Sequence, residues 1–227
     1  YHHWTAAYPT AWWGPPKQLV ERGPYELGLD YWQGCEALKG DILSHALDNA
    51  SLLPMKMAGH VPVIDWSNDG TSIHAQNRGG LHGIQWNVRP GHVSREFTDL
   101  RDGRVLEVDI RICQGRGIGV WIGRSDESQL GILLNAESKV IEFGGLSYTM
   151  HGASLIFAPE ERVDWRLTTG AKHKLRVLAR GYFVEVYLDN RFVHAFVSAV
   201  PLDTTSVGFF AELASGEFIN PSFWEMV

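Results

Sequence analysis

Short runs in which apolar and polar residues alternate one by one fill the chain from residue 61 onward, and no other feature constrains the fold as strongly. In "VLEVDIRIC" the apolar side chains share one face of an extended strand: Leu106, Val108, Ile110 and Ile112. In "FVEVYLDNRFVHAF" the alternation continues on both sides of Asp189-Asn190, a dipeptide that predicts a tight hairpin turn. A period of two with turn residues between the runs is typical of antiparallel sheets that bury one face. The pattern predicts an all-β fold, a two-sheet antiparallel sandwich.

The first sixty residues differ in composition, being rich in aromatic residues, proline and glycine. The stretch "YPTAWWGPPKQLV" carries Pro9, Pro15 and Pro16, which exclude a regular helix or a central strand. We therefore expect residues 1–60 to form an extended, aromatic-rich N-terminal segment or linker that packs on the sandwich or on a partner. Residues 61–227 are expected to form the sandwich, with helix limited to a turn or two near residues 41–53.

Charge and hydropathy exclude two classes of partner. The formal net charge is −6 and Lys and Arg are not clustered, so we do not expect the protein to bind nucleic acid. No apolar stretch is long enough to cross a bilayer and no signal region is recognisable, so we expect no membrane partner. Because the chain starts at Tyr1 rather than Met, we expect it to be a processed or excised piece of a longer protein.

Cysteine and metal-binding patterns give little sign of a cofactor. Cys35 and Cys113 lie far apart and form no metal signature, so two buried, unpaired thiols are expected ahead of one disulfide. The sequence has no HExxH motif and no paired CxxC motif. We expect no cofactor and no metal, with structural calcium left open at two oxygen-rich stretches, "DWSNDG" (65–70) and "SDES" (125–128). Ordinary turns are equally rich in Asp, Asn and Ser, so both stretches can also be turns without a bound ion.

Several segments taken in order resemble a known fold family. These are "DWSNDGTSIHA", "VLEVDIRI", "GIGVWIGRSD", "HKLRVLARGYFVEVYLDNRFV" and "SVGFFAELASGEFINPSFWEM". Residues 60–227 resemble a concanavalin A-like (laminin G-like) jelly-roll, and more narrowly the C-terminal sandwich of family 32 glycoside hydrolases and the family 66 carbohydrate-binding modules. The resemblance implies a jelly-roll, an extracellular or periplasmic location, and a role beside a glycoside hydrolase domain. The first forty residues are similar to the linker that joins the propeller of family 32 to its sandwich, but the propeller's WMNDPNG and RDP motifs are absent.

A sugar-binding site needs an aromatic platform and a few planar hydrogen-bonding groups. In "GIGVWIGR" the indole of Trp121 stands on one face of its strand between glycines, so it is the candidate platform. Charged and phenolic side chains of other strands would share that face and orient the sugar hydroxyls: Glu107, Asp109, Arg111, Glu185 and Tyr187. Alternatively, the N-terminal segment packs over the indole of Trp121 and shields it from solvent. Trp12 and Trp13 either pack on the sandwich or form a second platform.

Catalytic residues are not expected from the motifs. Sandwich hydrolases carry ExDxxE on one strand, whereas here Glu107-x-Asp109 is followed by Ile112 at the third position. The sequence therefore predicts a non-catalytic carbohydrate-binding module for polysaccharide or oligosaccharide, accessory to a glycoside hydrolase. Two alternatives stay open: a sandwich hydrolase or polysaccharide lyase using Glu107, Asp109 and Glu185, and a structural domain that docks on a catalytic partner.

Overall fold

The computed structural model describes residues 2–3, 12–44, 52–54, 64–77, 79–86, 103–124, 128–148 and 155–227, and most of them lie in antiparallel strands. The N-terminal elements are β1 (His2–His3), β2 (Trp12–Trp13), β3 (Lys17–Gly23), β4 (Glu26–Tyr31), the 3-10 helix η1 (Gln33–Leu38) and β5 (Lys39–Ser44). The remaining strands are β6 (Leu52–Pro54), β7 (Ile64–Asn68), β8 (Ser72–Asn77), β9 (Leu81–Trp86), β10 (Gly103–Arg124), β11 (Gln129–Asn135), β12 (Val140–Tyr148), β13 (Leu155–Asp164), β14 (Lys172–Arg180), β15 (Phe183–Leu188), β16 (Arg191–Val197) and β17 (Leu202–Met226). The predicted all-β fold is confirmed.

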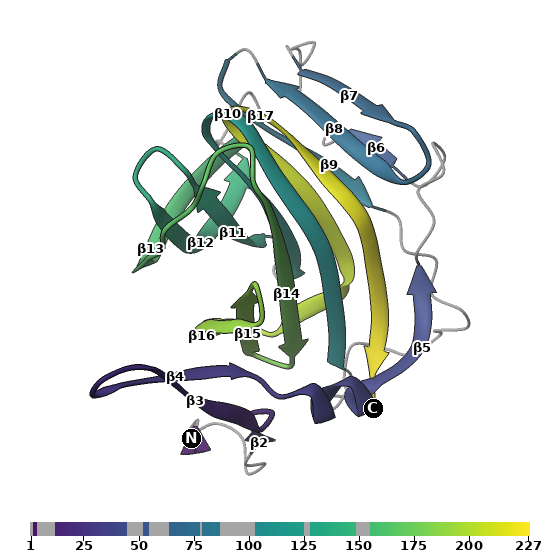
Figure 1. The fold of residues 1–227 in the computed structure, drawn as a ribbon. Helices are drawn as coiled ribbons and strands as arrows, with labels where there is room; N and C mark the ends of the chain where they lie inside the picture. Colours follow the sequence, from purple (N-terminus) through teal and green to yellow (C-terminus); the bar gives the residue numbers. More distant parts are fainter. Residues whose placement is uncertain are drawn as a thin grey trace.

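Two long strands, β10 and β17, organise the fold, because they pair with each other along nearly their whole lengths and bend on the way (Figure 1). The first half of β10 also pairs with β14, and its second half pairs with β11. Each long strand therefore belongs to two sheets. We call these the β14 sheet (β16, β15, β14, first half of β10, second half of β17, β5) and the β11 sheet (β13, β12, β11, second half of β10, first half of β17, β9, β6).

The core between the sheets comes from the alternating apolar residues that the sequence singled out. Leu106, Val108, Ile110 and Ile112 of β10 are at most 1% exposed, and they pack with the inward residues of β15, which are Val184, Val186 and Leu188. The turn between β15 and β16 has positive φ at both Asp189 (52°) and Asn190 (64°), which is the backbone of a tight hairpin. Both sequence predictions are confirmed.

β10 bends where its pairing with β17 is irregular. The register shifts between Ile112 and Gln114, and Gly115 follows with a φ of +87°. A Cβ atom at Gly115 would also collide with the carbonyl oxygen of Leu213 on β17. Glycine is required here because other residues rarely adopt this φ and because the two backbones touch.

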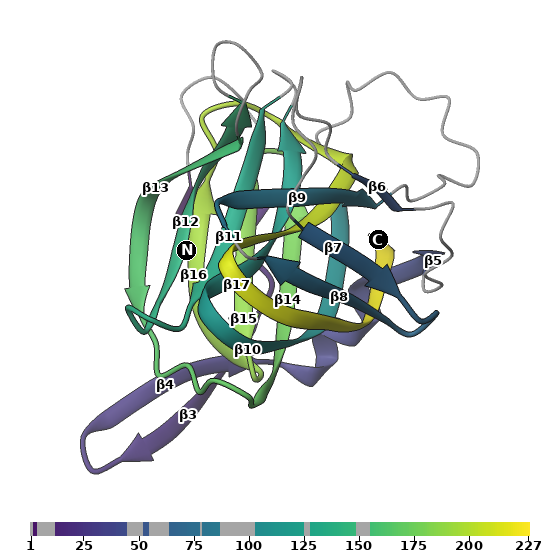
Figure 2. The same cartoon turned by 90° about the horizontal axis from the view of Figure 1, so that it is seen from above.

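The N-terminal segment joins the β14 sheet at both of its edges. β4 meets β16 where Asp30 lies opposite Arg191, and β5 pairs with the end of β17. Between these contacts the segment crosses the outer face of the sheet, and the β3–β4 hairpin extends beyond the sandwich (Figure 2). That hairpin exposes Leu19, Tyr25 and Leu27.

The helix expected near residues 41–53 is absent from the described part of that range. Residues 41–44 belong to β5 and residues 52–54 form β6, whereas 45–51 lie outside the described residues. Pairing with β17 gives the backbone of 39–44 hydrogen-bond partners, and this outweighs a weak local preference for helix. The helical turn lies earlier, at η1.

The cysteine prediction is half right. Cys35 and Cys113 are unpaired, and Cys35 is buried, but Cys113 is exposed because it lies at the register shift of β10.

Trp32 is 47% exposed, and the side chains of Trp12 and Trp13 lie outside the described residues. In the described ranges the structure holds no helix long and apolar enough to span a membrane.

Replacing two glycines separately tests the bend. Gly170→Ala adds a methyl group at a φ of +82° with nothing within 4 Å, so only backbone strain of about 1–2 kcal/mol is expected. Gly115→Ala adds the same strain and a collision with the β17 backbone, so it should reduce the free energy of unfolding by a further ~1–3 kcal/mol. Urea unfolding of both variants measures the difference. Equal losses would mean that β17 does not limit the bend.

Candidate functional site

The outer face of the β14 sheet gathers most of the polar residues predicted from the sequence. On β10, Glu107 lies opposite Arg176 of β14, and Asp109 lies opposite Lys174. On β14 itself, Arg176 lies opposite Tyr187 of β15. The face therefore carries five of the six predicted site residues: Glu107, Asp109, Arg111, Glu185 and Tyr187.

Trp121 does not belong to this face. It lies on the half of β10 that pairs with β11, and it is only 1% exposed. Its indole packs among apolar side chains of β9, β11, β12, β13 and β17, which are Leu81, Leu133, Leu146, Leu155 and Phe210. A Cβ on Gly208 of β17 would lie 2.5 Å from the indole, so the neighbouring glycine makes room for the ring. An indole buried this way cannot stack on a sugar, and the described residues that cover it belong to the sandwich strands.

Truncating Trp121 should therefore reduce stability. Trp121→Ala removes a fully buried ring and is expected to lower the free energy of unfolding by about 3–5 kcal/mol. Trp32→Ala is the matched control, because Trp32 is 47% exposed and should cost well under half as much. Chemical denaturation measures both. A Trp121→Ala protein as stable as the control would contradict the buried position.

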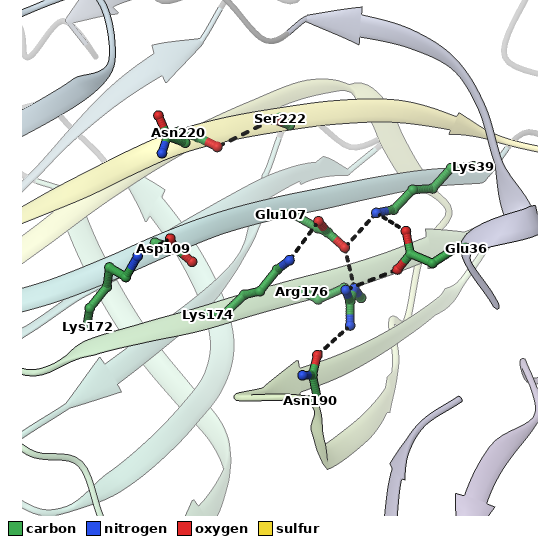
Figure 3. A network of polar contacts seen from close by, with 10 residues as sticks. All are labelled: Glu36, Lys39, Glu107, Asp109, Lys172, Lys174, Arg176, Asn190, Asn220 and Ser222. Atoms are coloured by element: carbon green, nitrogen blue, oxygen red, sulfur yellow. Dashed lines mark hydrogen bonds and ion pairs between the residues drawn. The ribbon is translucent and has the colours of Figure 1, made fainter. Parts of the chain in front are cut away.

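A buried ionic network ties the N-terminal segment to the outer face (Figure 3). Arg176 donates from Nε to Glu107 and from Nη2 to Glu36 Oε1 at 3.2 Å. Lys39 Nζ lies 2.6 Å from Glu36 and 2.8 Å from Glu107. The guanidinium carbon of Arg176 also lies 3.5 Å from the ring centre of Tyr31. The network thus joins β10 and β14 to β4, η1 and the start of β5.

The pKa of Glu107 reflects this environment. Burial alone would raise the pKa of its carboxyl group, but hydrogen bonds from Lys39 and Arg176 and the positive charge of Arg176 hold it below the ordinary value of 4.5. Burial raises the pKa of the Tyr187 phenol, and the charge of Glu185 raises it further. Glu107 is therefore ionised at neutral pH, and Tyr187 keeps its proton.

Variants that break the network should change the free energy of unfolding, and its dependence on pH, in a known direction. Arg176→Met leaves Glu107 without its main partner and should destabilise the fold by about 3 kcal/mol, whereas Glu107→Leu combined with Arg176→Met should recover most of that loss. A carboxyl group whose folded pKa is lowered stabilises the fold above its unfolded pKa, and this stabilisation is lost as the pH falls through the folded pKa. Wild-type stability should decline below about pH 4.5, and the double variant should lack this part of the decline. Urea titrations at several pH values measure it, and identical pH profiles would refute the assignment.

The rest of the predicted polar set is more exposed. Asp109 pairs with Lys172 at 2.9 Å, and Arg111 pairs with Glu217 at 2.9 Å. These pairs form a solvated charged surface beside the network. Each of these two carboxylates has a cationic partner.

A pocket of about 460 Å³ lies at the other end of the face. The strip 14–17 forms one wall, and β4, β15 and β16 form the others. Lys17 Nζ lies 2.8 Å from Glu185 Oε1, and the hydroxyl group of Tyr187 donates to Glu185 Oε2 at 2.8 Å. The apolar lining includes Phe183 and Phe192. Its volume falls within the range of small-molecule sites.

Of the ten residues that line the pocket, only Glu185 was among the predicted site residues, and those missed include Lys17, Phe192 and His194. Phe192 carried a readable signal. The predicted hairpin turn sets the pairing of β15 with β16, so Phe192 lies opposite Tyr187 and Ala195 opposite Glu185. Phe192 therefore had to join the face already assigned to Glu185, whereas the register shift between Val186 and Tyr187 places His194 opposite the core residue Val186, with its ring against Phe143. Lys17 depends on the docking of the N-terminal strip, for which the sequence has no signal.

The oxygen-rich stretches considered for calcium show turn chemistry where they are described. Asp69 Oδ1 accepts hydrogen bonds from the backbone amides of Thr71 and Ser72, and Asn68 Oδ1 accepts one from Gly70. Residues 125–127 of the second stretch lie outside the described residues. Across the described part of the chain, no group of three or more His, Cys, Asp or Glu side chains is arranged to hold a metal ion.

Comparison with known proteins shows the fold. No family model and no curated protein matches the sequence. The family 66 carbohydrate-binding module from Bacillus subtilis is 18% identical, with a TM-score of 0.53 over 77% of this chain and 95% of that one. A Bacillus subtilis protein of unknown function with a galectin-like fold is 9% identical, with a TM-score of 0.54 over 83% of this chain and 98% of that one. A sialidase is 11% identical, with a TM-score of 0.51 over 88% of this chain but only 19% of the sialidase.

These likenesses agree with the strand order described above. The chain folds as a concanavalin A-like, galectin-type jelly-roll sandwich that resembles the family 66 carbohydrate-binding module. The fold predicted from the sequence motifs is confirmed.

Proposed function

We propose that the protein binds carbohydrate without cleaving it, and that the ligand occupies the pocket beside Glu185. The observation that carries the proposal is the composition of that pocket. Two aromatic residues, Phe183 and Phe192, line the same cavity as the carboxylate of Glu185 and the ammonium group of Lys17. Aromatic faces pack against the C–H faces of sugar rings, and charged groups bind the hydroxyl groups at the ring edge.

Binding is favoured over hydrolysis by the state of the carboxylates. Glycoside hydrolysis needs two carboxyl groups placed on either side of the scissile bond. Glu185 is the carboxylate among the lining residues described, and both of its oxygens already accept hydrogen bonds, from Lys17 and Tyr187. Glu107 is buried in its own network with Arg176 and Lys39. In this proposal Glu185 fixes the pocket wall, whereas the other predicted residues, Asp109 and Arg111, lie on the same face outside the pocket lining.

The wider role follows the likeness in fold. A family 66 carbohydrate-binding module shares the sandwich, and this supports a module that is accessory to a glycoside hydrolase and acts in an extracellular or periplasmic setting. Its partner would be a polysaccharide or oligosaccharide. The proposal needs no cofactor.

Two pocket variants and a control test the site. Phe192→Ala removes ring area from the pocket and should weaken sugar binding by roughly tenfold or more, since about 1–3 kcal/mol of apolar burial is lost. Glu185→Gln keeps the shape but breaks the charge pair with Lys17, and should weaken binding less. Ile156→Ala changes an exposed residue on β13, outside the pocket, and should leave binding unchanged.

Isothermal titration against soluble fructans, xylans and β-glucans measures these effects, with a reducing-sugar assay alongside. Unchanged binding by Phe192→Ala would place the ligand elsewhere. Release of reducing sugar that Glu185→Gln abolishes would show an enzyme instead of a binding module.

A further inference from the structure

We propose that the pocket selects 6-deoxy sugars, in which a methyl group replaces the hydroxymethyl group of an ordinary hexose. This inference rests on the proposed carbohydrate binding at the same pocket. It comes from an imbalance in the lining, which is mainly apolar: Pro15, Pro16, Leu29, Phe183, Phe192 and Ala195.

The few polar groups of the pocket are already engaged with the protein. Glu185 accepts hydrogen bonds at both oxygens. Lys17 donates to Glu185 and, at 3.2 Å, to the carbonyl oxygen of Pro15. His194 Nε2 pairs with Glu161.

What remains for a ligand can be counted from the chemistry of these groups. An ammonium group has three N–H donors, so Lys17 keeps one, beside the ring of Phe192 whose centre lies 5.0 Å from Nζ. The imidazole of His194 packs against Phe143 on the core side of β16 and is not counted. Each oxygen of Glu185 keeps one further acceptor direction. The pocket can satisfy a small number of hydroxyl groups, all on the side of Lys17 and Glu185.

A fully hydroxylated sugar therefore fits this lining poorly. A hydroxymethyl group turned toward Leu29 and the two prolines would lose its hydrogen bonds to water and gain none from the protein. A methyl group in the same place gains from burial instead. The expected preference for the deoxy sugar is on the order of tenfold in Kd.

Pairs of sugars that differ only in methyl against hydroxymethyl test this preference directly. Methyl α-L-fucopyranoside differs from methyl α-L-galactopyranoside, and methyl α-L-rhamnopyranoside from methyl α-L-mannopyranoside, by methyl against hydroxymethyl alone. The full-length protein is titrated with each in two-dimensional NMR, which detects weak binding and shows whether pocket residues shift. In at least one pair the deoxy sugar should bind about tenfold more tightly.

Two variants then test the apolar wall. Leu29→Asn places a hydrogen-bonding group of similar size in the pocket and should remove most of the preference. Leu27→Asn makes the same change on the same strand at an exposed position outside the pocket, and should leave it intact.

The outcomes separate this inference from the function on which it rests. Equal or tighter binding of the hydroxymethyl sugars at the pocket would overturn the deoxy preference and leave carbohydrate binding in place. An unchanged preference in Leu29→Asn would also overturn it. If none of these sugars and none of the polysaccharides bind, both proposals are wrong.

Discussion

The buried pair of Glu107 and Arg176 is the interaction on which the candidate site depends. Two charges placed under a covering segment cost a great deal in lost hydration unless each is fully surrounded by partners. Here Arg176 is 4% exposed and reaches Glu107, Glu36 and Asn190, with the ring of Tyr31 over its guanidinium group. Three of those partners come from outside the β10–β14 pair, so the charges are satisfied only when the N-terminal segment and the β15–β16 turn are in place.

The pocket exists because that segment is docked. From the end of β4 through η1 to β5 the chain runs across the outer face, and Cys35 of η1 packs with Tyr31 and Tyr187 in a small apolar cluster. The thiol of Cys35 donates to the carbonyl oxygen of Pro16 at 3.3 Å, which connects the docked helix to the strip that walls the pocket. Close packing leaves little tolerance there, because a Cβ on Gly14 would lie 2.6 Å from Glu185 Oε1. Changes in the ionic network should therefore alter the pocket even though its residues do not line it.

The sequence predicted what depends on local periodicity and failed where distant segments meet. Alternation in β10 and β15 correctly separated core residues from the face that carries Glu107 and Glu185, because a strand turns every second side chain the same way. The glycines around Trp121 were interpreted as open space for a ligand. In fact glycines on the two neighbouring strands, Gly131 and Gly208, lie opposite Trp121 and leave room for its own ring. That arrangement depends on the register of three strands, which a single run of sequence does not contain.

The two buried carboxylates of the outer face show how the same residue type takes different roles. Glu107 is bound by three cationic side chains, Arg176 and Lys174 of the sheet and Lys39 of the covering segment, so its charge holds tertiary structure. Glu185 is equally buried, but its partners are Lys17 at the edge of a cavity and the phenol of Tyr187. A charge at the wall of a cavity orients the donors around it, and it leaves one N–H of Lys17 for a ligand. In the sugar complex that we propose, this small group of donors and acceptors sets which edge of the ring faces inward, and Phe183 and Phe192 set how much of the ring is buried.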